Sequence, residues 1–240
     1  MTFTKLTNLS VFITKKTRNA VGYYKKYGLL AFLKLLMAKL FFNRTLIFLH
    51  LNLNNYLSDP RERFQFRSLT KPEILKIRNY DDGFHTKNQA LDKINKGDMV
   101  FVHEEGDKIA YYVWIEQQNA EVDWFRLRMK LPPEIAYLSG SFTIPEFRNK
   151  GIASRTRKEV FLYLKNKGIK HIILAVHPDN QAALILNRKS GFKEYQLINY
   201  RHYGFLRYYK VSSTKSNRSN TYIRFISAPR DIWKAFADFA

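Results

Sequence analysis

One segment of the sequence constrains the fold more than any other: an apolar strand that passes through a short loop directly into a helix. Residues 135–143 favour a strand, and a helix is predicted from about Gly151 to Asn166, ended by Lys167-Gly168. Between the two lies the loop Ile144-Pro-Glu-Phe-Arg-Asn-Lys-Gly-Ile-Ala-Ser154. A strand that turns into a helix in this way is typical of mixed α/β domains.

The same loop has the properties of a phosphate site. Gly151 and Ala153 are small, so that a ligand can approach the backbone closely. The first N–H groups of a helix have no partner within it, and together with the helix dipole they attract an anion. Arg148 and Lys150 add positive charge at the loop. The sequence therefore predicts a site for a nucleotide pyrophosphate, formed by Arg148, Asn149, Lys150, Gly151, Ile152, Ala153 and Ser154.

The surrounding elements indicate one mixed α/β domain with an extension at each end. From Arg61 the predicted order is β-α-α-β-β-β-β-α-β-α-β-β. We divide the chain into a basic N-terminal extension at 1–60, a domain at 61–211 and a basic C-terminal tail at 212–240. The extension is expected to hold a helix at 18–42 and a strand at 45–53, and the tail a strand at 221–226 and a helix at 230–239. Within the domain, residues 122–129 are expected to form one strand.

Composition excludes several classes of site and indicates an anionic partner. The 240 residues include no cysteine, which excludes disulfides, thiolate metal sites and a cysteine nucleophile, and we predict no metal site. The net charge is +21, and the first 60 residues carry 9 basic and 1 acidic side chains. Such charge suits anionic lipid, nucleic acid or a phosphorylated substrate. No apolar run reaches the roughly 20 residues of a membrane span, so we expect a cytoplasmic protein.

Two motifs together resemble the GNAT N-acetyltransferase superfamily. Arg148-Asn-Lys-Gly151-Ile-Ala153 is similar to its Arg/Gln-x-x-Gly-x-Gly/Ala signature. One strand and one helix later, Asn180-Gln-Ala-Ala183-Leu-Ile-Leu-Asn-Arg-Lys189-Ser-Gly191-Phe192 resembles the family's Asn-x-x-Ala-(x)5-Lys-x-Gly-Phe segment. The basic N-terminal helix is similar to extensions on acyltransferases of envelope polysaccharide pathways. Its charge also permits a peripheral position on an anionic membrane surface at the inner face.

The resemblance implies both a fold and a cosubstrate. The fold is a central, mostly antiparallel sheet that splays between the family's fourth and fifth strands and is flanked by helices. Here these strands are Ile135–Thr143 and His171–Val176. The cosubstrate is acetyl-CoA or another acyl-CoA, whose pyrophosphate would lie on the loop before the helix and whose pantetheine arm would lie beside Asn180 and Ala183. Backbone N–H groups of Phe142, Thr143 and Ile144 would hold the thioester carbonyl.

The acceptor implied by the resemblance is a primary amine, on a small molecule or on a lipid-linked compound such as an amino sugar or an envelope precursor. Asn187 departs from the family, in which many members have a tyrosine that donates a proton to the CoA sulfur. Asparagine can donate a hydrogen bond but is no acid in this range, so Tyr137, Tyr195 or a water would have to supply the proton. A packed aromatic on a strand is the alternative interpretation of each tyrosine.

The general base is open among four side chains: His177, Glu134, Glu116 and His103. His177 ends the family's fifth strand, and the ordinary pKa of a histidine suits the role, but we favour the interpretation of a surface histidine beside Pro178. For Glu116, an exposed residue at the end of a hairpin is the alternative.

Two other functions remain open at this point. A tRNA-linked transferase or toxin of the same fold would use the basic and aromatic residues near the C-terminus, which are Arg201, Tyr203, Arg207, Tyr208, Tyr209, Lys210, Lys215 and Arg218. A binding module that keeps the fold without catalysis is the other, and Asn187 favours it. The oligomeric state is not determined by the sequence.

Overall fold

The computed structural model describes residues 25–35, 37, 41–54, 56, 66–76, 87–122, 127–204, 206–214, 219–225 and 232–233. The chain divides into two compact units. The larger contains the described residues of Thr45–Ile198, Lys210–Asn220 and Ala228–Ala240. The smaller contains those of Met1–Arg44, Asn199–Tyr209 and Thr221–Ser227.

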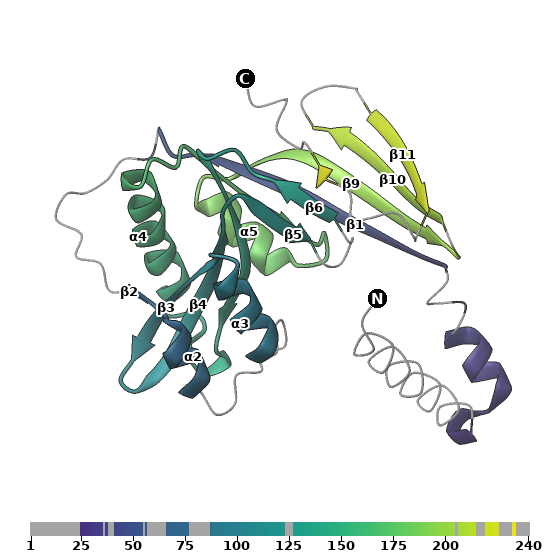
Figure 1. The fold of residues 1–240 in the computed structure, drawn as a ribbon, viewed down its shortest axis with the longest axis horizontal. Helices are drawn as coiled ribbons and strands as arrows, with labels where there is room; N and C mark the ends of the chain where they lie inside the picture. Colours follow the sequence, from purple (N-terminus) through teal and green to yellow (C-terminus); the bar gives the residue numbers. More distant parts are fainter. Residues whose placement is uncertain are drawn as a thin grey trace, which may run out of the picture. The chain divides into compact units, whose positions relative to one another are not determined.

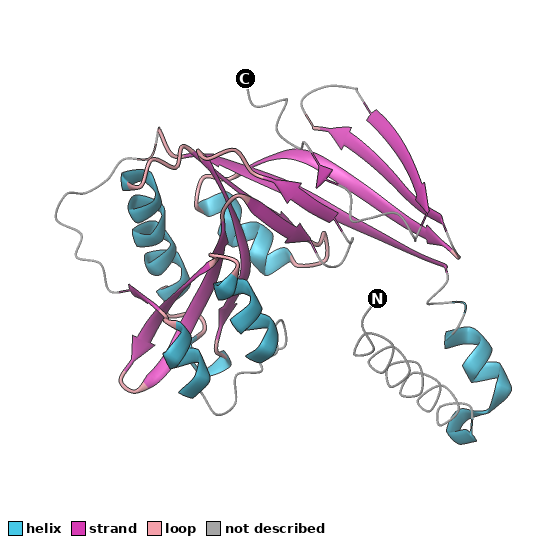
Figure 2. Ribbon diagram, in the orientation of Figure 1, coloured by secondary structure: helices cyan, strands magenta, loops and turns pink. Residues whose placement is uncertain are grey.

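Helices and strands follow the predicted order closely (Figures 1 and 2). Residues 25–35 are helical, and the later helices are α2 (Lys71–Lys76), α3 (Lys87–Asn95), the 3-10 turn η2 (Pro145–Phe147), α4 (Ile152–Asn166) and α5 (Gln181–Lys189). The first seven strands are β1 (Phe41–Asn52), β2 (Phe66–Ser68), β3 (Met99–Glu105), β4 (Lys108–Glu116), β5 (Asn119–Val122), β6 (Leu127–Lys130) and β7 (Ile135–Thr143). The others are β8 (His171–Val176), β9 (Lys193–Tyr203), β10 (Leu206–Ser213), β11 (Ser219–Phe225) and β12 (Ile232–Trp233).

Nine strands form the main sheet, in the order β11-β10-β9-β1-β8-β7-β4-β3-β2. The pairs β2–β3, β3–β4, β4–β7 and β1–β8 are antiparallel, whereas β7 and β8 are parallel. The predicted fold class, a mixed α/β domain with a large, mostly antiparallel sheet flanked by helices, is confirmed. The strands β5, β6 and β12 form a separate sheet of three.

Alternation along β3 and β4 explains why helices cover both faces of this part of the sheet. Phe101, Tyr111 and Val113 belong to the apolar cluster that contains Val160, Phe161 and Leu164 of α4. Their neighbours Val100, Tyr112 and Trp114 pack with Ile74 of α2 and Ala90 of α3. Figure 1 shows α4 on one side of β3 and β4, and α2 and α3 on the other. The sheet is therefore buried on both faces here.

The strand β1 takes a position that the sequence did not indicate. It was expected within an extension that precedes the domain, yet it lies between β8 and β9 and pairs with β8 from Ile47↔Val176 to Asn52↔His171. Leu49, Leu51 and Leu53 are buried with α5 and the apolar residues of β8. The main sheet therefore includes chain that comes before residue 61.

Other expectations differ in detail. Residues 122–129 were expected to form one strand, but the structure has the hairpin β5–β6, in which Val122 pairs with Leu127. The C-terminal helix expected at 230–239 is wrong where the structure describes it, because Ile232 and Trp233 pair with β6 as a strand. Of the N-terminal helix expected at 18–42, the end is wrong, because Phe41 already belongs to β1. Residues 18–24 lie outside the described part.

Candidate active site

The carboxyl ends of β7 and β8 lie at the same edge of the sheet, because the two strands are parallel neighbours. Each strand leads into a helix: β7 through η2 into α4, and β8 through a turn into α5. Their pairing runs only from Ile135↔His171 to Tyr137↔Ile173, although both strands continue beyond it. Open α/β sheets bind ligands at the carboxyl ends of such strands, so this is where we place the candidate site.

A β-bulge lies in β7 at the point where its pairing with β8 has ended. Tyr112 pairs with Phe142 and Trp114 with Ser139, so Gly140 and Ser141 together face the single residue between Tyr112 and Trp114. Gly140 has φ of +49°, a conformation that glycine adopts without strain. In a regular strand, Ser139 and Ser141 would lie on the same face of the sheet. Because of the extra residue they lie on opposite faces: Ser139 bonds Glu116 on the side of α3, and Ser141 bonds Tyr111 on the side of α4.

One of the three expected oxyanion donors is already engaged. The N–H of Ile144 donates to the carbonyl of Ala110 at 3.0 Å, so it is not available to a thioester. In an antiparallel ladder the direction of the N–H groups alternates. The N–H group of Phe142 therefore points toward β4, as that of Ile144 does, and the N–H group of Thr143 points away from β4. On that unpaired edge the carbonyl of Thr143 accepts a bond from Arg148 Nε at 3.1 Å. Thr143 is the remaining candidate donor.

The loop before α4 presents backbone N–H groups and positive charge. Gly151 has φ of +74° and is the N-cap of α4, and no side chain caps this helix end. Asn149 also has positive φ, at +63°. The N–H groups of Ile152, Ala153 and Ser154 therefore begin a helix of 15 residues without an acceptor among the described residues. Arg148 and Lys150 are exposed, with their cations over the rings of Phe142 and Phe147.

At the end of β8, the candidate residues form the start of α5. Asn180 is the N-cap, and its side-chain oxygen accepts a bond from the N–H of Ala183 at 3.1 Å. This leaves the amide nitrogen of exposed Asn180 as a donor. His177 Nδ1 accepts from the N–H of Asp179 at 3.2 Å within the same turn. That bond gives His177 a structural role in shaping the turn.

Asn187 does not stand alone in the structure. Its side-chain oxygen accepts a bond of 2.5 Å from Arg157 Nη2, and both side chains are buried. From the sequence, Arg157 was expected to continue the positive charge of the loop along the first turns of α4, and the structure corrects this, because its side chain is buried. Tyr111 and Ser141 were not predicted, because only the pairing of β4 with β7 brings their side chains together. Their hydroxyls are 2.7 Å apart, and burial raises the pKa of Tyr111.

The tyrosines considered as proton donors are packed. Tyr137 is buried on β7 at its last pair with β8. Tyr195 is buried on β9, and burial raises its pKa. A phenol whose pKa is raised gives up its proton less readily in the neutral range. Neither position favours the role of an acid.

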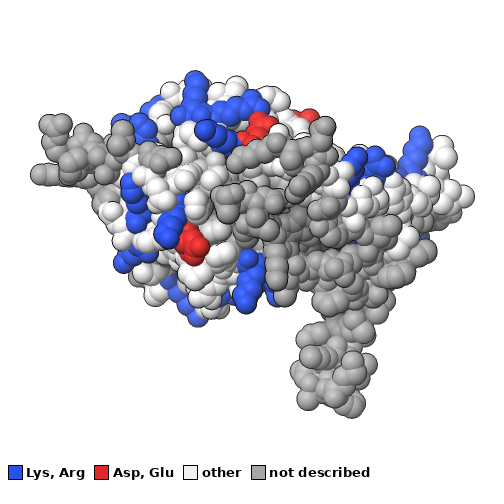
Figure 3. Space-filling model, turned by 90° about the horizontal axis from the view of Figure 1, so that it is seen from above, with Lys and Arg blue, Asp and Glu red and all other residues white. Residues whose placement is uncertain are grey.

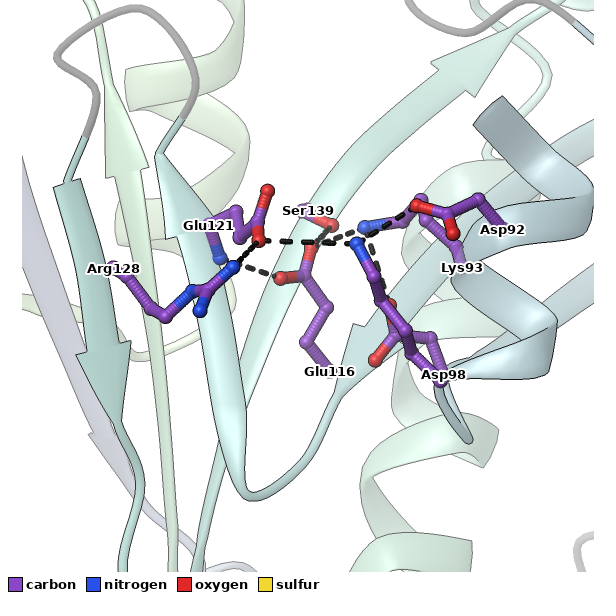
Figure 4. Close-up of polar contacts among 8 residues, drawn as sticks. Asp92, Lys93, Asp98, Glu116, Glu121, Arg128 and Ser139 are labelled. Carbon is purple, nitrogen blue, oxygen red and sulfur yellow. Dashed lines mark hydrogen bonds and ion pairs between the residues drawn. The ribbon is translucent and has the colours of Figure 1, made fainter. Parts of the chain in front are cut away.

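The candidate bases are mostly engaged. Glu116 is 2% exposed, which corrects the interpretation of an exposed hairpin residue. It accepts bonds from Lys93 Nζ at 2.6 Å, from Ser139 Oγ at 2.5 Å and from the N–H of Glu121 at 2.9 Å (Figure 4). His103 is buried, and its Nε2 lies 3.1 Å from Oε1 of Glu105. For Glu134 the bonds found are to its backbone carbonyl, which accepts from the N–H groups of Lys170 and His171, so they do not engage its carboxylate.

Figure 4 shows that Lys93 connects Glu116 with a second acidic side chain, Asp98, 3.5 Å from its ammonium. Burial raises the pKa of Asp98 from 3.8 to about 6, against the opposing effect of Lys93. The folded state therefore binds this proton more tightly than the unfolded chain, and the stability that protonated Asp98 gives is lost as pH rises from about 4 to 6.

We expect Asp98→Asn to raise the free energy of unfolding at pH 8, because an amide carries no charge to bury. The difference between the ordinary pKa of 3.8 and the raised pKa of about 6 corresponds to at most about 3 kcal/mol of unfolding free energy. This gain in stability should vanish near pH 4. Urea denaturation at both pH values measures it. Asp92→Asn is the control, since Asp92 is exposed and pairs only with the exposed Lys96 among the described residues. A destabilised Asp98→Asn protein at pH 8 would contradict the expectation.

Comparison with known proteins identifies the family. A model of the acetyltransferase (GNAT) family matches residues 61–192. The chain belongs to this family. The match includes the loop before α4 and the whole of α5, and it begins after β1.

Individual relatives of this GNAT domain are distant. N-alpha-acetyltransferase 30 of Schizosaccharomyces pombe is 31% identical over 67 residues, which are 28% of this chain and 44% of that protein. The match thus spans less than half of that curated relative. A solved GNAT acetyltransferase from Colwellia psychrerythraea has 15% identity and a TM-score of 0.46, covering 64% of this chain and 53% of its own. An aminoglycoside N-acetyltransferase in complex with CoA has 19% identity and a TM-score of 0.41, covering 54% and 91%.

Proposed function

We propose that the domain binds an acyl-CoA at the carboxyl ends of β7 and β8 and transfers its acyl group to a primary amine. The observation that carries this proposal is the uncapped start of α4 in a chain of the GNAT family. Gly151 holds the left-handed conformation there, and a Cβ added to it would meet nothing within 4 Å. The backbone is thus open to a pyrophosphate, to which unpaired N–H groups and exposed Arg148 and Lys150 are complementary.

The charge of the surface supports an anionic cosubstrate. On the face seen in Figure 3, Lys and Arg side chains are spread widely over the described surface, and Asp and Glu are confined to smaller areas. A cationic surface attracts a CoA phosphate group over a longer range than direct contact does. This support is general, whereas the loop offers a local site in which backbone N–H groups and cations converge on one anion.

The residues of the site suit direct transfer. The N–H of Thr143 lies on the unpaired edge of β7, where it can donate to the thioester oxygen as the amine attacks the carbonyl carbon. As the C–N bond forms and the C–S bond breaks, the electron pair stays on sulfur and the amine loses a proton to solvent. Asn180 would donate through its free amide nitrogen to the pantetheine arm.

An acceptor screen tests the function. The full chain is incubated with labelled acetyl-CoA and amines of several classes: amino sugars, aminoglycosides, lipid-linked amines, and peptides with a free N-terminus. Transfer to one class would establish the reaction. Binding of acetyl-CoA without transfer to any class would favour a non-catalytic CoA-binding module.

The alternative of an RNA-linked transferase has less support in the structure. Of the basic residues on which it depends, Arg207 is buried with 3% of its surface exposed, so its charge is not displayed to a phosphate backbone. Arg201 is exposed and lies over the ring of Tyr208. Lys215 and Arg218 lie outside the described residues. Co-purification of RNA with the full chain at moderate salt would revive this alternative.

We also propose that the helical residues 25–35 contact an anionic membrane surface. Exposed apolar side chains lie beside Lys25, Lys26 and Lys34 in this segment and just beyond it: Tyr27, Leu29, Leu30, Leu33 and Met37. Such a combination favours the interface between headgroups and acyl chains. Within the described part of the chain, no helix has the length and hydropathy needed to cross a bilayer.

We expect the double variant Leu29→Glu/Leu30→Glu to lose flotation with vesicles that contain phosphatidylglycerol. It replaces the two most exposed leucines of the described residues by side chains with the same negative charge as the lipid. These side chains are 59% and 69% exposed. The control Ile185→Glu removes an exposed apolar side chain from α5 instead and should leave flotation unchanged. Equal flotation of all three proteins would refute the membrane proposal.

A further inference from the structure

Arg157 is a buried cation that has no carboxylate partner among the described residues. Its side chain is 2% exposed, and its guanidinium carbon lies 5.6 Å and 5.5 Å from the ring centres of Phe161 and Phe192. No Asp or Glu of the described residues forms an ion pair with it, and its Nε has no hydrogen-bond partner there. Burial lowers its pKa, although an arginine keeps its proton. Burying an unpaired charge is costly, so this arrangement needs an explanation.

The hydrogen bond that Arg157 does make is to a neutral amide. A guanidinium has donors only, so the Asn187 side chain must present its oxygen to Arg157 and its nitrogen in the other direction. The orientation of this amide is therefore determined by chemistry. A donor that carries positive charge also polarises the amide, which strengthens the N–H on its far side as a donor.

Asn187 lies along the face of α5 that begins at Asn180. The two are seven positions apart, which is close to two full turns, so they share one stripe of the helix about 10 Å apart with Ala183 between them. If the pantetheine arm contacts Asn180 and runs from there along this stripe of α5, a position two turns further along is near the end of the arm. The end of the arm carries the sulfur.

We infer that Arg157 holds Asn187 as an N–H donor to the CoA sulfur, so that the leaving group departs as a thiolate. This inference rests on the proposed function. When the amine attacks, its C–N bond forms, the C–S bond breaks and the electron pair remains on sulfur. The thiolate accepts a hydrogen bond from Asn187 Nδ2, and the positive charge of Arg157 behind the amide stabilises it. The thiolate later takes a proton from solvent, so no acidic side chain is required.

In this scheme Asn187 is the catalytic residue and Arg157 positions it. The arrangement explains why a basic side chain is buried against Phe161 and Phe192 with no counter-ion among the described residues. A carboxylate at Asn187 would satisfy Arg157 better, but it would repel a thiolate and donate no hydrogen bond. Stability and chemistry therefore make opposite demands on this position, and that difference makes the inference testable.

The test is Asn187→Asp, which has nearly the same shape and gives Arg157 an ion-pair partner. Thermal unfolding of this variant should show a Tm equal to or above that of the parent. We expect kcat with acetyl-CoA to fall by about 100-fold, as when an oxyanion donor is removed, with little change in KM. Arg157→Met should lose kcat in the same way, and Arg157→Lys should keep part of it.

A binding measurement without turnover separates positioning from structure. CoA affinity of the parent protein should rise as the free thiol titrates at alkaline pH, above the value of about 8.5 of a cysteine side chain, because the site prefers the thiolate. Desulfo-CoA, which lacks the sulfur, should show no such rise, and Asn187→Asp should lose it for CoA. An unchanged kcat and an unchanged pH dependence in Asn187→Asp would overturn the inference. If the parent bound neither CoA nor desulfo-CoA, the proposed function itself would fail.

Discussion

Replacing Gly151 by valine should weaken CoA binding by about 100-fold, equivalent to roughly 2.7 kcal/mol. Two effects act together. The left-handed conformation at φ of +74° is strained for a branched side chain. The added side chain would also occupy the open space above the N–H groups of α4, where the pyrophosphate is proposed to lie. Isothermal titration of CoA into both proteins measures the difference.

Gly168, just beyond the other end of α4, provides a matched control. It has φ of +86°, and a Cβ added there also meets nothing within 4 Å. Gly168→Val therefore carries similar backbone strain, about 1–2 kcal/mol, but lies at the end of the helix that is remote from the loop. It should lose stability as Gly151→Val does while keeping CoA affinity. Equal affinity losses in both variants would show that strain alone is responsible.

The second large effect concerns β1. A chain that begins at residue 54 keeps the whole segment matched by the family, yet we expect it not to fold cooperatively. It lacks the strand that pairs with β8 over six positions, and Phe48, Leu49, Leu51 and Leu53 would no longer cover the apolar residues of that region. Loss of even one such leucine costs about 2–5 kcal/mol, which is a large part of the usual stability of a domain. Circular dichroism during thermal unfolding measures the outcome.

A chain that begins at residue 38 is the appropriate control, because it lacks the helical residues 25–35 but keeps β1 complete. It should unfold in a single cooperative transition. A chain beginning at residue 54 that unfolds with the same Tm would show that β1 is dispensable, and the division of the chain at residue 60 would then be the correct one.

The part of the fold that the sequence predicts well is the part with strong local signals. Gly168 ends α4 and Asn180 caps α5, and both boundaries agree with the structure to within one or two residues. The motif around Gly151 was sufficient to place the loop between a strand and a helix. Such signals depend on neighbours in the sequence, and a single chain contains them in full.

The pairing of β1 could not be predicted in the same way. Residues 45–53 were expected to form a strand, but nothing local indicates that its partner is β8, more than a hundred residues later. The β-bulge at Gly140 and Ser141 is a similar case, because it is defined by the register against β4. Non-local pairing and register follow from the tertiary packing, which a reading of local patterns does not contain.

The candidate site shows the same division. The phosphate loop was predicted from residues adjacent in the sequence, whereas Arg157 gained meaning only when the structure brought it to Asn187, thirty residues away. Glu116 was a candidate base with an exposed hairpin residue as the alternative, and neither interpretation included the Lys93 of α3 and the Ser139 of β7 that bond its buried carboxylate. Polar groups are buried when distant segments complete their hydrogen bonds.

The central claim, that the carboxyl ends of β7 and β8 bind an acyl-CoA, is tested most directly by calorimetric titration of acetyl-CoA into the full chain. We predict one binding site per chain, with an affinity that falls as salt is added, because the phosphates are held by exposed cations and backbone N–H groups. Absence of binding at about 1 mM acetyl-CoA, the upper end of usual Michaelis constants, by a protein shown to be folded would contradict the claim.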